Sequence, residues 1–244
     1  MKALSRLKGL GALMVIAALP GMAATFNLQD LIDNNTVITV GDKEFFDFDL
    51  LAVTTNCPSI VGCSSFINLT ADANVITVGT VESMLPTSPG IVFSGPLVLD
   101  NTQGTTNAFL DILLTYSVRQ VNGLPLIGSI TNAFTGGGQN GNVSISEVAT
   151  SITPVAGLTA NSNLSLNLND FSDPPAEALD TLVFSQPVSS VRVEKDIFFS
   201  AIVGGFVDAT GITQKVNQVP EPSALLLMGT ALLGLGYIRK RARK

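Results

Sequence analysis

The 244-residue sequence predicts an all-β fold, an antiparallel β-sandwich of jelly-roll-like or Ig-like type, with a closed barrel as the alternative. Two observations lead to this prediction. Apolar and polar residues alternate with a period of two along several segments, as they do in strands with one face in a core and one in water. Clusters of Gly, Asn and Pro separate these segments about every ten residues, as turns do between short strands.

The alternation predicts four strands directly, within residues 46–50, 110–119, 164–169 and 191–194. In the second of these, one face is expected to carry Leu110, Ile112, Leu114, Tyr116 and Val118. In the first, Phe46 and Phe48 are expected inside and Asp47 and Asp49 outside. Two further strands are predicted in 36–40 and 75–78, because β-branched residues pack well in sheets.

Turn residues are expected to break the strands at 41–42, 122–123 and 173–175. Residues 136–141, Gly-Gly-Gly-Gln-Asn-Gly, are predicted to form a hairpin loop. They lack the Lys-Ser/Thr pair and the helix that a phosphate-binding loop needs. Helical signals are few, and short turns of helix are expected only at 26–32 and 176–179.

The N-terminal residues 1–23 have the three parts of a secretory signal peptide. Lys2, Arg6 and Lys8 precede an apolar run of eleven residues, 9–19, which is too short to span a bilayer comfortably. We expect signal peptidase to cleave after Ala23, with Ala24 as the alternative.

The C-terminal residues 219–244 combine a Pro-rich motif, an apolar segment and a basic cluster. Residues 223–238 carry no charge and would form a transmembrane helix of roughly 24 Å at about 1.5 Å per residue. This is short of a hydrocarbon core of about 30 Å, a gap that local thinning and long basic side chains can close. By the positive-inside rule, the basic cluster would stay in the cytoplasm as a membrane stop: Arg239, Lys240, Arg241, Arg243 and Lys244.

The order of Pro220-Glu221-Pro222, one apolar helix and a terminal basic cluster resembles the PEP-CTERM sorting domain. The resemblance covers about the last 26 residues. It implies an exported protein of a bacterium that makes exopolysaccharide, anchored in the inner membrane until an exosortase-type membrane protease processes it. It also implies that Pro220, Glu221 and Pro222 are the recognition residues. A plain tail anchor with a Pro-rich linker is the alternative.

The exported part, residues 24–218, is long enough for one domain with a real core. With Glu221 included, it holds five Lys and Arg against 19 Asp and Glu, a net charge of −14. Such a surface repels nucleic acid and anionic lipid, so nucleic-acid binding is excluded as a main role.

The cysteines, Cys57 and Cys63, are expected to form a structural disulfide, because an exported chain meets an oxidising compartment. The chain has no histidine, which excludes nucleophile systems that depend on His and nearly all zinc hydrolases. A glycosidase needs only two facing carboxyl groups, but sugar clefts usually also offer aromatic rings, and the chain has no Trp and two Tyr. We therefore expect a protein that is not an enzyme.

No cofactor is expected, although calcium binding is an alternative. Four carboxylates, those of Asp42, Glu44, Asp47 and Asp49, cluster within eight residues and are of the ligand type that calcium prefers. A solvated acidic face is the other interpretation.

We expect an exported protein of the cell surface or extracellular matrix, with a structural or interaction role associated with exopolysaccharide. The alternatives are a secreted polysaccharide-modifying enzyme using paired carboxylates and a calcium- or glycan-binding adhesive module.

Overall fold

The computed structural model describes residues 16–17, 24–56, 76–81, 88–95, 97–121, 126–168, 176–219 and 230. The predicted cleavage site at Ala23, the pair Cys57 and Cys63, and the tail residues 220–229 and 231–244 lie outside the described residues.

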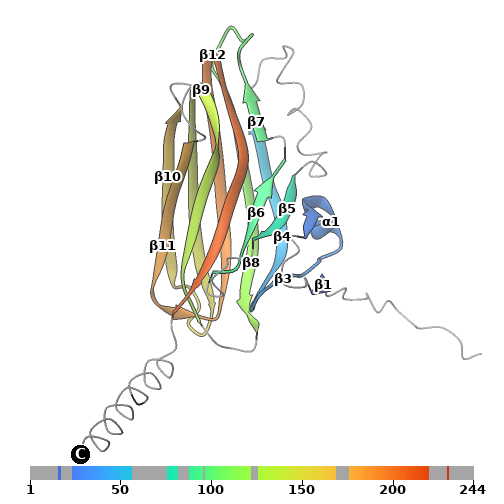
Figure 1. Ribbon diagram of the computed structural model, residues 1–244, viewed down its shortest axis with the longest axis vertical. Coiled ribbons are helices and arrows are strands. Elements are labelled where there is room, and N and C mark those ends of the chain that lie inside the picture. The colour runs from blue at the N-terminus through green and yellow to red at the C-terminus, as the bar shows by residue number, and fades with distance from the viewer. Residues whose placement is uncertain are drawn as a thin grey trace, which may run out of the picture.

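The protein is all-β, with an antiparallel sheet of twelve strands that curls on itself (Figure 1). The elements are β1 (Ile16–Ala17), β2 (Thr25–Asn27), α1 (Leu28–Asp33), β3 (Ile38–Val40), β4 (Lys43–Thr55), β5 (Thr77–Val81), β6 (Gly90–Ser94), β7 (Leu97–Asp100), β8 (Ala108–Gln120), β9 (Ile127–Thr153), β10 (Thr159–Leu168), β11 (Ala176–Val188) and β12 (Ser190–Gln218). Every pairing described is antiparallel except that of β1 with β3.

The two long strands, β9 and β12, pair with each other along almost their whole length and divide the sheet into two halves. In the first half, residues 190–201 of β12 lie between β8 and residues 141–153 of β9, which in turn pair with β10. In the second half, residues 206–218 of β12 pair with β6 and β7 on one side and with residues 127–139 of β9 on the other. These residues of β9 pair in turn with β11. Inward side chains of the two halves contact each other, so the halves face each other across one core.

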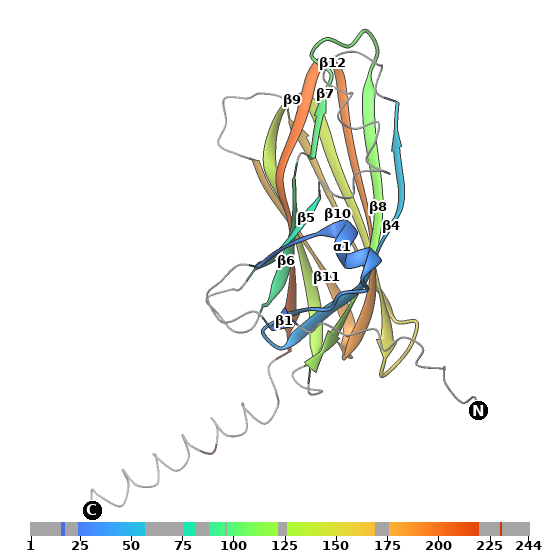
Figure 2. The same cartoon turned by 90° about the vertical axis from the view of Figure 1, so that its right-hand side faces the viewer.

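The sides of the molecule are covered by short elements and edge strands. On one side α1 lies between β4 and β5 in Figure 2 and buries Leu28 and Leu31. The Asn27 side chain caps this helix by accepting a hydrogen bond from Gln29 N at 2.8 Å. On the other side the edge strands β10 and β11 lie close together, and Asp180 of β11 accepts a hydrogen bond from the backbone N of Asn163.

The predicted strand pattern is confirmed in most places. Leu110, Ile112, Leu114, Tyr116 and Val118 are all buried on one face of β8. The alternation in 164–168 and 191–194 places the apolar residues of β10 and β12 inward. The turn at 41–42 is also present, with Gly41 at φ 58 between β3 and β4, and the helix predicted in 26–32 is α1.

Two predictions of local structure are wrong. Residues 176–179 begin strand β11 rather than a turn of helix, because Ala176 to Val183 pair with β9 and this pairing outweighs helix propensity. Phe46 does not share a face with the buried Phe48, because the register with β8 shifts between Phe46 and Asp49. Phe45 is buried in place of Phe46.

The predicted hairpin loop at 136–141 is also wrong, since these residues lie inside β9 and all of them except Asn140 pair with β12. They form the bend at which β9 passes from one half to the other. A Cβ on Gly136 would lie 2.2 Å from the carbonyl oxygen of Asp208, and one on Gly138 would lie 2.6 Å from that of Phe206. Glycine is therefore required because the two backbones approach closely here.

Strand β12 bends at the same place with extra residues. Residues 202–205 stand opposite Asn140 alone, and Gly204 adopts a φ of 81, which glycine tolerates without strain. Asn101, which follows β7, holds this bend: its backbone N and O bond to Gly205 O and Gly204 N, and its side chain donates to Ala201 O at 3.1 Å.

We predict that Gly136→Ala lowers the free energy of unfolding by about 1–3 kcal/mol, because the added methyl group meets backbone that cannot move aside. Gly137→Ala is the matched control, since a Cβ there has no atom within 4 Å. Urea unfolding of both variants measures the difference. Equal stability of the two would contradict the close approach at the bend.

Candidate functional site

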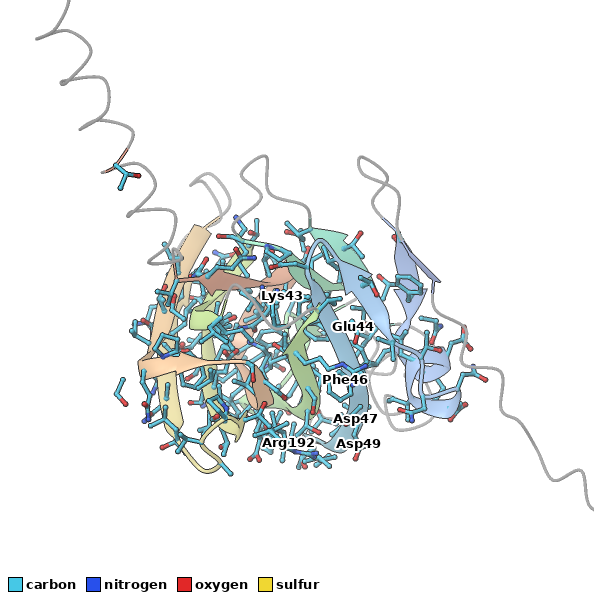
Figure 3. The ribbon with its side chains drawn as sticks, turned by 90° about the horizontal axis from the view of Figure 1, so that it is seen from below. Lys43, Glu44, Phe46, Asp47, Asp49 and Arg192 are labelled. Atoms are coloured by element: carbon cyan, nitrogen blue, oxygen red, sulfur yellow. The ribbon has the colours of Figure 1, made fainter. Side chains whose placement is uncertain are left out.

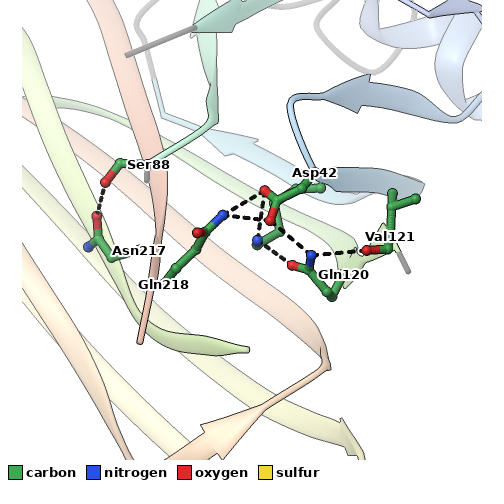
Figure 4. A network of polar contacts seen from close by, with 7 residues as sticks. Asp42, Ser88, Gln120, Val121, Asn217 and Gln218 are labelled. Atoms are coloured by element: carbon green, nitrogen blue, oxygen red, sulfur yellow. Dashed lines mark hydrogen bonds and ion pairs between the residues drawn. The ribbon is translucent and has the colours of Figure 1, made fainter. Parts of the chain in front are cut away.

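The four acidic residues proposed as a calcium site do not form one group. Asp42 lies in the turn before β4 and accepts hydrogen bonds from Lys43 Nζ at 2.9 Å, Gln120 Nε2 at 2.8 Å and Gln218 Nε2 at 2.7 and 2.6 Å (Figure 4). Lys43 Nζ also donates to Gln120 Oε1. Asp42 thus ties the β3–β4 turn to the ends of β8 and β12. Burial lowers the pKa of Lys43, and the bond to Asp42 opposes this.

The other three acidic residues lie along β4 (Figure 3). Glu44 accepts from Arg119 Nε at 2.5 Å, and the guanidinium of Arg119 lies 4.8 Å from the centre of the Phe46 ring. Asp47 and Asp49 are exposed on either side of the buried Phe48. Among the described residues, no group of three or more His, Cys, Asp or Glu side chains is placed to hold a metal ion.

A regular polar surface lies on the outer face of the first half, which we call the ladder face. It consists of the outward residues of four neighbouring strands, aligned in rows by the register. Its residues are Phe109, Asp111 and Leu113 of β8; Arg192, Glu194, Asp196, Phe198 and Ser200 of β12; Asn142, Ser144, Ser146, Val148 and Thr150 of β9; and Thr159, Asn161, Asn163, Ser165 and Asn167 of β10. Thr115 and Ser117 continue the β8 row but are buried.

The two strands at one side of the ladder face, β9 and β10, carry almost only hydroxyl and amide side chains. All five outward residues of β10 are exposed. Each of these side chains can donate and accept hydrogen bonds, and none carries a charge. The sequence pattern showed the alternation in β10, but only the register places its Asn and Ser residues beside those of β9.

The strands at the other side, β8 and β12, add rings and charges. Phe109 and Phe198 stack with their ring centres 5.9 Å apart. Asp196 lies diagonally across from Asp111, and burial raises the pKa of Asp196, helped by a hydrogen bond to Asp111 and by the negative charges of Asp111 and Glu194. Arg192 donates to Thr115 Oγ1 at 3.1 Å.

The second half has a hollow of about 420 Å³ on β9, β11 and β12. It is lined by Thr131, Ala133, Phe134, Thr135, Ala178, Leu179, Thr213 and Lys215. Its polar groups are threonine hydroxyls and one ammonium, without a described carboxylate in the lining. It offers fewer polar groups than the ladder face.

Beyond the last strand, residues 218–242 match the family model of the PEP-CTERM protein-sorting motif. The chain carries a PEP-CTERM sorting signal. The match includes Pro220, Glu221 and Pro222, whose geometry lies outside the described residues. A PEP-CTERM signal indicates an exported protein that an exosortase processes, as the sequence predicted.

The predicted membrane helix at 223–238 falls in the tail, where only Thr230 is described. Among the described residues, no helix has the length and apolar character needed to cross a membrane.

A search of curated proteins finds no match to the chain. Among solved structures, TmCBM61 in complex with beta-1,4-galactotriose has a TM-score of 0.31 and 10% identity, covering 69% of this chain and 87% of that one. The enzymatically active domain of bacteriophage CBA120 tailspike protein 4 has a TM-score of 0.29 and 14% identity, covering 66% of this chain and 19% of that one. At these values neither likeness assigns a role to this PEP-CTERM protein.

We predict that Asp196→Asn stabilises the protein at pH 7 and that the gain disappears near pH 3. The raised pKa means that folding costs free energy once the unfolded carboxyl ionises, above about pH 3.9. Melting temperatures of the wild type and the variant across this pH range measure the effect. A gain that is the same at both pH values would contradict the raised pKa. Ser146→Ala, on the neighbouring strand, is the matched control.

Proposed function

We propose that the exported part is a β-sandwich module that binds extracellular polysaccharide through the ladder face and does not cleave it. The arrangement of hydroxyl and amide side chains in rows carries this proposal. Sugar hydroxyls both donate and accept hydrogen bonds, and Ser, Thr and Asn side chains complement them in both roles. The Phe109–Phe198 pair adds apolar ring surface at one end of the face.

The shape of the face also supports a polymer ligand. Its rows extend over four strands, which at about 4.8 Å per strand gives a width suited to several sugar residues rather than to one small molecule. Export by the PEP-CTERM route would deliver this face to the outside of the cell, where exopolysaccharide is found.

The ladder face also carries a pair of carboxyl groups. Asp111 and Asp196 are diagonal neighbours on β8 and β12, and the negative charge of Asp111 contributes to the raised pKa of Asp196. A glycosidase also uses two carboxyl groups, so polymer length is the measurement that separates binding from hydrolysis.

We predict that the double variant Asn161→Ala/Asn163→Ala weakens binding to the producer's exopolysaccharide by about ten-fold or more, the effect of about 1.4 kcal/mol. The matched control is Thr213→Ala/Leu179→Ala, which alters the hollow on the other half. Affinity electrophoresis through gels containing the polymer measures both, and a sizing column records polymer length. A shortened polymer would contradict the proposal, as would equal binding by the first variant and the wild type.

We predict that Glu221→Ala leaves the protein in the inner membrane, because Pro-Glu-Pro is proposed as the recognition sequence of the exosortase. Asp33→Asn, which removes an exposed carboxylate at the end of α1, is the control. Cell fractionation with detection of the β domain measures the distribution. Release of the Glu221 variant at the level of the wild type would contradict the sorting role of this residue.

A further inference from the structure

Four polar side chains lie fully buried at the centre of the core, where the two halves of the sheet face each other. In the first half, Lys195 of β12 stands directly opposite Glu147 of β9. In the second half, Gln214 of β12 stands directly opposite Asn132 of β9. The exposed fractions of these residues are 0% for Lys195, Asn132 and Gln214 and 1% for Glu147.

Hydrogen bonds connect these residues both within the first half and between the two halves. Lys195 Nζ lies 2.5 Å from Glu147 Oε2 and 3.0 Å from Asn132 Oδ1. Gln214 Nε2 donates to Glu147 Oε1 at 2.8 Å. An amine, a carboxylate and a carboxamide therefore meet in one buried site, with the amine and the carboxamide supplied by opposite halves.

The surroundings make it easier for the Lys195 ammonium to lose a proton. Apolar neighbours in the strands, such as Val193, Ile197 and Ile145, are buried on either side of the site. Burial lowers the pKa of Lys195, while the charge of Glu147 opposes this. The nearby Tyr116 ring is enclosed by Phe45, Phe48 and Phe93, and burial together with Glu147 raises the pKa of its hydroxyl well above its usual value.

The carboxamide of Asn132 is in direct contact with the Lys195 nitrogen. Its Oδ1 accepts a hydrogen bond from the Lys195 ammonium, which polarises the C=O bond. Its Nδ2 has no hydrogen-bond partner among the described residues. The nitrogen that would leave in an attack on this carboxamide is thus the atom without a hydrogen bond in the described part of the chain.

We propose that Lys195 and Asn132 join spontaneously in an intramolecular amide bond, with Glu147 carrying the protons. Glu147 takes a proton from the ammonium, and the free amine attacks the Asn132 carboxamide carbon. The C–Nδ2 bond then breaks as Glu147 passes a proton to the leaving nitrogen, and ammonia departs. The five protons on the two nitrogens end as one in the new amide, three in ammonia and one on Glu147.

The reaction needs no oxidant, metal or cofactor. Holding the reacting groups in contact replaces a bimolecular encounter with an internal step, which accelerates amide formation greatly. The product would replace a buried ion pair, which is costly to keep out of water, with neutral groups. It would also link β12 of the first half to β9 of the second covalently.

Peptide mapping of the full chain tests this proposal. Trypsin has no cleavage site between Arg119 and Arg192, so Asn132 lies in the peptide Gln120–Arg192. A modified Lys195 resists cleavage, which leaves Val193–Lys215 intact. The link therefore predicts one branched species made of these two peptides, lighter than their sum by one ammonia.

Three variants identify the roles. Lys195→Arg and Glu147→Gln should give only linear peptides while circular dichroism shows a folded β protein. Asn132→Asp should give a branched species lighter by one water instead of one ammonia, a signature that a structural role for Asn132 would not produce. Linear peptides alone from the folded wild-type protein would overturn the proposal without any variant. A closed Val193–Lys215 peptide, with Gln120–Arg192 free, would assign the link to Gln214 and overturn the assignment to Asn132.

Discussion

Strands β9 and β12 pair with each other on both sides of a shared bend, and five further strands pair directly with one of the two. In the first half of the sheet, β8 pairs with β12 and β10 pairs with β9. In the second half, β6 and β7 pair with β12 and β11 pairs with β9. The bend depends on a local choice of residues. Gly136 and Gly138 allow the backbones to approach, and the four-residue expansion at 202–205 gives β12 the extra length that the turn needs. Because the bend brings the halves face to face, the core exists only when it forms.

The sequence predicts the all-β class and most inward faces because period-two alternation is a local property. It is reliable in β8, where five apolar residues keep phase for nine positions. It fails where non-local pairing decides. A Gly-rich segment has the composition of a hairpin loop, and only its partner in β12 makes 136–141 a strand. Likewise, 176–179 has helix-forming residues but pairs with β9. The bulge after Phe46 inverts the phase of β4, and a single residue of slip exchanges the two faces of a strand.

The candidate site, too, can be predicted from the sequence only in the part that depends on local alternation. The alternation in β10 can be predicted, but the ladder face arises when registers align four strands that span residues 109 to 200. The carboxylates that are neighbours in sequence separate instead, because Asp42 and Glu44 take partners on other strands. A local signal did exist for the buried site. Lys195 keeps the phase of Val191 and Val193, and Glu147 that of Val143 and Ile145, so alternation alone points both charges inward. Lys195 and Glu147 lie close to Asn132 only because the bend brings the second half of the sheet opposite the first.

A charged site in the middle of such a core needs a physical reason. Apolar residues of similar volume usually give equal or greater stability than a buried ion pair, so stability alone does not favour keeping Lys195 and Glu147. One reason is register: Lys195 bonds to Glu147 and Asn132, and Gln214 bonds to Glu147, only in this alignment, and a slip would leave a buried charge unpaired. The ion pair alone, however, would be enough to fix the register, and it would not need a carboxamide on the opposite half. The contact between the amine and Asn132 is the one that the proposed covalent link would use to hold the two halves together outside the cell.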